Sequence, residues 1–218
     1  MLLIYPPVAK ACEPPAGITQ LAGALRGNGL PCTLLDANLE GLLFLLAAAD
    51  QPYDTWSRRA YRSLTANLAA LRSHPLYTNQ DRYQRAVSDV NRMLELAGPG
   101  KNIGLSLANY QDKALSPLQS KDLLRAAEQP EQNIFYDYFA KRLEQLLTAE
   151  QPALLGISLN YLSQAIPAFA MIGFVKQVAP ELPIVLGGGL VTSWLSNPDW
   201  ENPFAGLVDY LVPGPGAT

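Results

Sequence analysis

Short apolar runs alternate with segments of helical periodicity along this chain, and no other feature of the sequence restricts the fold as much. Runs dominated by apolar residues are typical of strands buried on both faces of a sheet. Five such runs are present, namely LLIY (2–5), CTLLD (32–36), ALLGIS (153–158), PIVLGG (183–188) and GLVDYLVPG (206–214). Strands that alternate with helices indicate a parallel sheet with right-handed crossovers. We therefore predict an α/β fold with a flavodoxin-like (Rossmann-type) five-stranded parallel sheet in the order 2-1-3-4-5.

One of the predicted helices is almost entirely apolar. It covers residues 165–175, with Ser163 as the candidate N-cap and Pro167 in the first turn, where proline is tolerated. A helix that is apolar all round is expected to be buried on every side. We therefore expect it to pack on the sheet, beneath another element.

A long segment separates the second predicted strand from the third. Apolar residues recur at helical spacing over residues 56–71 and 83–94, whereas residues 100–135 are polar and predict loops and short helices. The segment is far too long for one crossover helix. We predict a mostly helical insertion, 41–149, that caps one side of an α/β domain made of residues 1–40 and 150–216.

The composition excludes several classes of function. The chain has 218 residues, a net charge of −3 and no basic run, which argues against a nucleic-acid partner. Its two cysteines cannot form a disulfide framework or a zinc cluster. The first residues, MLLIYPP, do not resemble a signal peptide, and the apolar run LEGLLFLLAAAD is too short to span a bilayer. We expect a cytoplasmic protein without a membrane partner.

Ligands of open parallel sheets bind beyond the carboxyl ends of the strands. Small and polar residues gather at those ends in this sequence, and charged catalytic groups do not, so we predict no catalytic residue. The rule selects Pro6, Pro7, Glu13, Asp36, Asn38, Ser158, Asn160, Tyr161, Gly187, Gly188, Gly189, Gly214 and Gly216. The three consecutive glycines either let a ligand approach the backbone or form a tight turn against a neighbouring strand. The sequence from Gly187 does not complete the dinucleotide-binding pattern G-x-G-x-x-G, because Thr192 occupies the position of the third glycine.

Five segments together carry a resemblance to a known family. They are LLIYPP, EPPAGITQLAGALRGNG with the following LLD, LLGISLNY, PIVLGGGLVTSW and VDYLVPG. In order and spacing they resemble the N-terminal cobalamin-binding domain of cobalamin-dependent radical S-adenosylmethionine enzymes, over about residues 1–40 and 150–216. The resemblance implies that the cofactor is cobalamin, with its dimethylbenzimidazole tail against a serine after the third strand and against glycines and hydroxyls after the fourth. The implied cofactor-binding residues are Ser158, Leu159, Asn160, Gly187, Gly188, Gly189, Thr192 and Ser193, with Pro6, Pro7, Glu13 and Asp36 facing the ligand.

Two departures from the family pattern modify these expectations. The loop PPVAKACEPPAG lacks the histidine that ligates cobalt in many such domains, so the resemblance implies base-off cobalamin without a histidine ligand. The end of the sequence, PGPGAT, replaces the acidic motif that usually leads into the radical domain. Two cysteines cannot hold an iron–sulfur cluster. The cluster, S-adenosylmethionine and catalysis are therefore expected in a C-terminal radical domain in cis, outside this chain.

Two alternative functions remain open at this point. One is a scaffold or substrate-recognition domain that keeps the fold without cobalamin, and the other is an FMN- or nucleotide-binding flavodoxin-like protein. A wide slot between Ser158 and residues 187–193 favours cobalamin, whereas a slot filled by side chains of residues 42–150 favours the scaffold. The lone His74 is expected at a helix end, and Cys12 as a small apolar residue, rather than as metal ligands.

Overall fold

The computed structural model describes residues 1–12, 15–50, 52–98 and 102–214. Within them, five parallel strands form one sheet in the order β2-β1-β5-β6-β7. These strands are β1 (Leu2–Tyr5), β2 (Thr33–Asp36), β5 (Leu155–Ser158), β6 (Ile184–Gly187) and β7 (Tyr210–Val212). An α/β fold with an all-parallel five-stranded sheet was predicted and is observed.

The insertion contributes two strands that the sequence did not predict. β3 (Ile103–Leu105) and β4 (Tyr110–Asp112) form a separate antiparallel hairpin in the polar region where only loops and short helices were expected. Ile103, Leu105 and Tyr110 are buried in the main core, which gives these short strands their apolar face. The strand numbers in the sheet therefore differ from the predicted 2-1-3-4-5, because β3 and β4 lie outside it.

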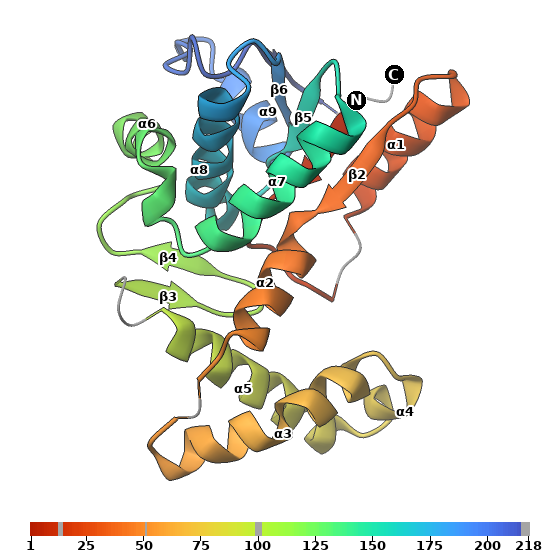
Figure 1. Cartoon of the computed structure of the whole chain (residues 1–218), viewed down its shortest axis with the longest axis vertical. Helices are drawn as coiled ribbons and strands as arrows, with labels where there is room; N and C mark the ends of the chain where they lie inside the picture. Colours follow the sequence, from red (N-terminus) through yellow and green to blue (C-terminus); the bar gives the residue numbers. More distant parts are fainter. Residues whose placement is uncertain (13–14, 51, 99–101, 215–218) are drawn as a thin grey trace.

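The two faces of the sheet are covered unequally. Residues 2, 4, 155, 157, 184 and 186 point into the main core, which is closed by α2 (Ala37–Ala47), α7 (Tyr136–Glu150) and α8 (Leu162–Val178). The opposite face carries α1 (Ala16–Gly27), which packs on β1 and β2. Figure 1 shows α1 on the far side of the sheet from α7 and α8. The face of β5 and β6 beside α1 is therefore left without a covering helix among the described residues.

The apolar helix α8 lies at the centre of the molecule, where its sequence predicts it. Every residue from Gln164 to Val175 is buried. On its outer side α8 packs against α6 (Ser120–Glu128) and α7, and the approach to α6 is so close that a Cβ on Gly173 would overlap the backbone of Ala127. The prediction of its N-terminus was wrong in detail. Tyr161, and not Ser163, is the N-cap, so that Pro167 lies beyond the first turn.

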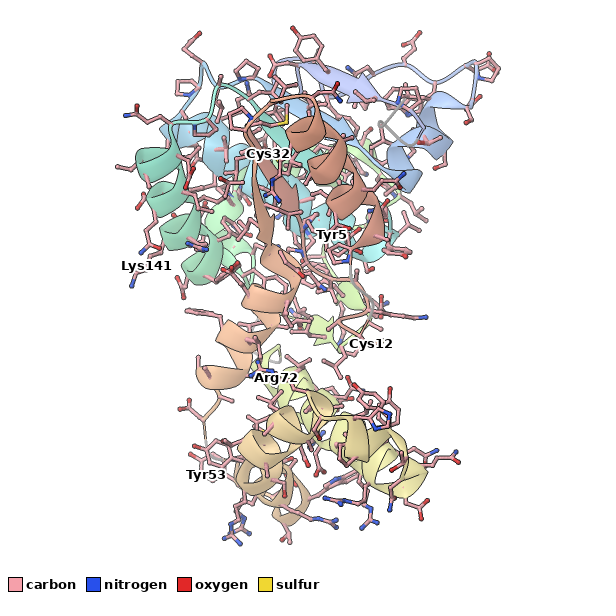
Figure 2. All side chains as sticks on the ribbon, turned by 90° about the vertical axis from the view of Figure 1, so that its right-hand side faces the viewer. Tyr5, Cys12, Cys32, Tyr53, Arg72 and Lys141 are labelled. Atoms are coloured by element: carbon pink, nitrogen blue, oxygen red, sulfur yellow. The ribbon has the colours of Figure 1, made fainter. Side chains whose placement is uncertain are left out.

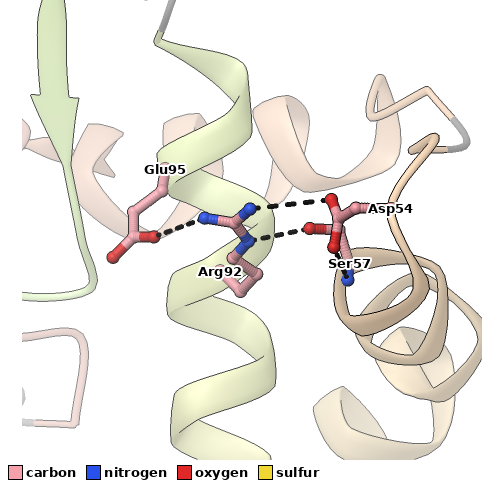
Figure 3. Close-up of polar contacts among 4 residues, drawn as sticks. All are labelled: Asp54, Ser57, Arg92 and Glu95. Atoms are coloured by element: carbon pink, nitrogen blue, oxygen red, sulfur yellow. Dashed lines mark hydrogen bonds and ion pairs between the residues drawn. The ribbon is translucent and has the colours of Figure 1, made fainter.

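The remaining helices form an arm below the sheet in Figure 1. They are α3 (Thr55–Leu71), α4 (His74–Tyr77) and α5 (Gln80–Ala97), and α3 packs along α5. Figure 3 shows the polar contacts at one end of this pair, where Arg92 of α5 reaches Ser57 and Asp54 at the start of α3. A 3-10 turn, η2 (Pro130–Gln132), and α9 (Gly189–Leu195) complete the elements discussed here. No helix of the described residues has the length and apolarity needed to cross a membrane.

Candidate functional site

A cleft of about 550 Å³ lies on the less covered face of the sheet, between α1 and strands β1, β5 and β6. This volume is within the range of about 300–1,000 Å³ that is usual for small-molecule sites. The cleft runs along the strands from their carboxyl ends to their amino ends. Its lining residues are Met1, Leu3, Gly17, Ile18, Leu21, Leu25, Leu154, Gly156, Ile157, Ser158, Asn160, Val185, Gly187, Gly188, Gly189, Thr192, Val212 and Gly214.

The cleft exists because small residues occupy the strand positions that face α1. Side chains alternate between the two faces of a sheet, so residues 156, 158 and 187 share a face with Leu3. The register places Gly156 beside Leu3 and Ser158 beside Gly187. A Cβ on Gly156 would lie 2.8 Å from Cδ2 of Leu3, so even alanine there would push that side chain. Glycine and serine at these positions of the central strands have little or no side chain, which leaves the space between the sheet and α1 open.

Asn160 organises the polar end of the cleft. Its Oδ1 accepts a hydrogen bond from the backbone N–H of Gly189 over 3.0 Å, and its Nδ2 donates to Oγ of Ser158 over 3.0 Å. Its backbone N–H donates to Oε1 of Gln164, which is wholly buried. The loop after β5 is thereby tied to the turn after β6, and the polar groups at the mouth of the cleft have fixed positions.

Gly188 is the one glycine of the triplet that the backbone requires. Its φ of 105° is rarely adopted by residues with a side chain, and a Cβ there would lie 2.5 Å from the carbonyl oxygen of Leu159. Gly187 and Gly189 have ordinary contact space around the same position. The triplet therefore serves both predicted purposes. Gly188 permits a tight turn against the backbone of Leu159, while Gly187 and Gly189 leave room for a ligand beside the cleft.

The loop after β1 is held from three sides. Gln164 donates its Nε2–H to the carbonyl oxygen of Pro6 over 2.8 Å, and the buried side chain of Asn38 bonds both the N–H and the C=O of Ala9. Pro167 has no N–H to bond the carbonyl of Ser163 within α8, and that carbonyl accepts the N–H of Val8 instead. Pro6 and Pro7 are buried and do not line the cleft.

Asp36 acts as the N-cap of α2, where its Oδ1 accepts the N–H of Leu39 over 2.9 Å. Burial raises the pKa of this carboxyl above its ordinary value, while the hydrogen bonds from the N–H groups of Leu39 and Asn38 act in the opposite direction. Asp36 lies at the carboxyl end of β2, as the sequence predicts, but outside the cleft.

The structure brings together six of the twelve residues that the resemblance implied as cofactor-binding or ligand-facing. Those that line the cleft are Ser158, Asn160, Gly187, Gly188, Gly189 and Thr192. Leu159 is wholly buried in the main core, and Ser193 faces a different, open groove beside Trp194 and Phe204. Glu13 and Gly216 lie outside the described residues. The hydroxyls of Thr192 and Ser193 donate to backbone carbonyls of their own turn, those of Gly188 and Leu190.

Sequence reasoning missed the apolar walls of the cleft. Leu3 and Val185 alternate with core residues along β1 and β6, and Ile18, Leu21 and Leu25 recur at helical spacing on α1. Those periodicities were visible in the sequence, and they indicated only that the positions face the sheet. Whether they meet another side chain or an open slot depends on the small residues opposite them.

The cleft offers apolar side chains and a few hydrogen-bonding groups to a ligand. None of its described lining residues has a side chain that ionises near neutral pH. Among the described residues no group of three or more His, Cys, Asp or Glu side chains could hold a metal ion. Cys12 is exposed and lies below Tyr5 in Figure 2, between the sheet and the helical arm, and His74 is exposed at the start of α4.

Comparison with known proteins gives no relative for this chain. No protein-family model matches it, and neither a curated protein nor a solved structure does.

Proposed function

We propose that this chain is a cobalamin-binding module with a flavodoxin-like sheet, of the kind that precedes the catalytic domain of radical S-adenosylmethionine enzymes. The observation that carries the proposal is the open cleft between α1 and the sheet. Each of the five segments that carry the resemblance contributes residues to its lining, including Val212 and Gly214 at the end of β7. None of its described lining residues comes from 41–149, whose side chains would fill the slot in a scaffold domain.

The residues present fit the tail of a corrinoid. Glycines at 187–189 give backbone access at the mouth, Ser158 and Asn160 supply polar groups there, and the walls are apolar. Such a floor suits a ligand with a polar linker and a flat end group. With its lower base in the cleft and away from cobalt, cobalamin would bind base-off, and no described lining residue is a histidine that could take the place of the base. Cobalamin would supply the organometallic chemistry, and this chain would supply binding and orientation.

The nucleotide-binding alternative receives less support. A phosphate site of that type uses backbone N–H groups and free hydroxyls at a helix N-terminus. Here α9 is seven residues long, and the hydroxyls of Thr192 and Ser193 are bonded to their own backbone.

The proposal is tested by titrating the purified chain with hydroxocobalamin, desalting it and recording the absorption spectrum. We expect about one equivalent of retained corrinoid with a base-off spectrum. Gly188 is unsuited to the blocking variant, because a side chain there would strike the carbonyl of Leu159. Gly17 is suitable, since it lines the cleft and a Cβ on it meets no atom within 4 Å.

Gly23 provides the matched control for the blocking variant. It lies on the same helix and has the same open space, but it does not line the cleft. Leucine favours a helix over glycine by about 0.5–1 kcal/mol, so neither substitution should weaken the fold. Gly17→Leu should lower retention at least tenfold, and Gly23→Leu should leave it unchanged. No retention by the unaltered chain, or equal retention by both variants, would overturn the proposal.

A further inference from the structure

The cleft is polar at one end and apolar at the other. Its polar lining residues, Ser158, Asn160 and Thr192, all lie at the carboxyl ends of the strands. Toward the amino ends the lining consists of residues without polar side-chain groups other than a thioether. They are Met1, Leu3, Leu21, Leu25, Leu154, Gly156 and Val185.

The direction of the chain fixes this gradient. β1, β5 and β6 run in parallel, so Met1 and Leu154 lie together at their amino ends. α1 runs back along the sheet from Ala16 to Gly27, which brings Leu25 to that same end and leaves Gly17 at the mouth. A ligand that enters past the glycine turn therefore meets hydrogen-bonding groups first and hydrocarbon last.

Backbone polar groups at the apolar end are already engaged. The N–H of Leu2 donates to the carbonyl of Leu154 over 3.0 Å, and the N–H of Leu155 donates to the carbonyl of Pro183 over 3.0 Å. The amino group of Met1 donates to the carbonyl of Pro31 over 3.2 Å. A ligand N–H group that reached this end would lose its water and find no oxygen or nitrogen acceptor on the described lining side chains there, which weakens binding.

We propose that the cleft selects cobamides by their lower base, binding those with an apolar benzimidazole in preference to those with adenine. This inference rests on the proposed function and adds to it the class of cobamide. The exocyclic amine of adenine would be desolvated against Leu21, Leu25 and Val185, where no partner lies among the described residues. The methylated benzene ring of a benzimidazole has no such group, and it buries apolar surface against the same side chains.

The experiment compares dissociation constants of three probes for the full chain, measured by calorimetry. The probes are cobalamin, the adenine-containing cobamide, and cobinamide, which lacks the lower base. We expect cobalamin to bind at least about tenfold more tightly than either of the others. Equal affinity for cobalamin and the adenine cobamide would overturn the selectivity alone. Equal affinity for cobinamide would show that the base does not enter the cleft, and binding of none of the three would overturn the proposed function as well.

A variant of α1 adds a second test. The ratio of the affinities for cobalamin and the adenine cobamide is compared between the variant and the unaltered chain, so that differences between the probes themselves cancel. Leu21→Gln places an amide in the middle of the cleft at little cost in helix propensity. It should reduce the preference for cobalamin over the adenine cobamide by several-fold. The matched control is Leu39→Gln on α2, where the leucine is 42% exposed and outside the cleft. An unchanged preference in Leu21→Gln would contradict the inference.

Discussion

The side-chain oxygen of Asn160 accepts a hydrogen bond from the N–H of Gly189 over 3.0 Å and thereby joins the ends of two neighbouring strands. The same amide donates to the hydroxyl oxygen of Ser158 over 3.0 Å. One residue thus fixes both polar borders of the cleft mouth. Because a preformed site loses less freedom when its ligand binds, this arrangement favours binding of a ligand at the mouth.

Two replacements of Asn160 should destabilise the mouth of the cleft to different extents. Asn160→Ala removes the bond from Gly189 and the bonds that Nδ2 donates to the hydroxyl and carbonyl oxygens of Ser158, and should lower the free energy of unfolding by about 1–2 kcal/mol. Asn160→Asp keeps an acceptor for Gly189 but loses the donor to Ser158, so its effect should be smaller. Urea denaturation measures both variants. Equal loss in the two would show that the bond to Gly189 contributes nothing to stability.

The glycine triplet gives a prediction with its own internal control. Gly188→Ala forces a side chain into a φ of 105° and against the carbonyl of Leu159, and should cost about 2 kcal/mol or more. The Cβ of Gly189→Ala would lie 3.7 Å from the carbonyl oxygen of Asn160, an ordinary contact, and should change stability by less than about 1 kcal/mol. Thermal unfolding of the two variants compares them directly. A similar melting temperature for both would contradict the structure of this turn.

The attachment of the helical arm offers a third test. Nε of Arg92 donates to Oγ of the wholly buried Ser57 over 2.8 Å, as Figure 3 shows, and the guanidinium also reaches Asp54 and Glu95. Ser57→Ala removes the acceptor and should lower the free energy of unfolding by about 1 kcal/mol. Thr65→Ala, at an exposed position of the same helix, is the control and should be nearly neutral. Hydrogen exchange of α3 and α5 would show whether the loss is local to the arm.

The raised pKa of Asp36 makes a prediction about pH. A carboxyl whose pKa is higher in the folded state than in the unfolded chain binds its proton more tightly when folded. Its contribution to stability is complete below the unfolded pKa and is lost as the pH rises through the folded value. Asp36→Asn keeps the cap on α2 and removes the ionisation. The variant should lose less stability than the unaltered chain as the pH rises across that window, as measured by urea denaturation. A steeper loss in the variant would show that the backbone hydrogen bonds outweigh burial.

The sequence by itself determined the pattern of the α/β unit. Apolar runs of strand length, the all-apolar segment of α8 and the glycines after β6 are local signals, because strand burial, helix burial and turn geometry each leave a periodicity or a residue type. They also located the mouth of the cleft, since parallel strands bring their carboxyl ends to one edge. Ser158, Asn160 and Gly187–Gly189 were found in this way.

Only the tertiary structure decided the remainder. The hairpin β3–β4 has weak local signals, and its strands form because Ile103, Leu105 and Tyr110 pack into a core built by distant helices. The presence of Pro167 in the sequence did not predict that the carbonyl of Ser163, which lacks its partner within α8, would accept the N–H of Val8. The cleft walls follow the same rule. Leu21 and Val185 face open space because Gly156 and Gly187, distant in sequence from α1, have no side chains to fill it. Periodicity tells which way a side chain points, and only the packing of distant segments tells what it meets there.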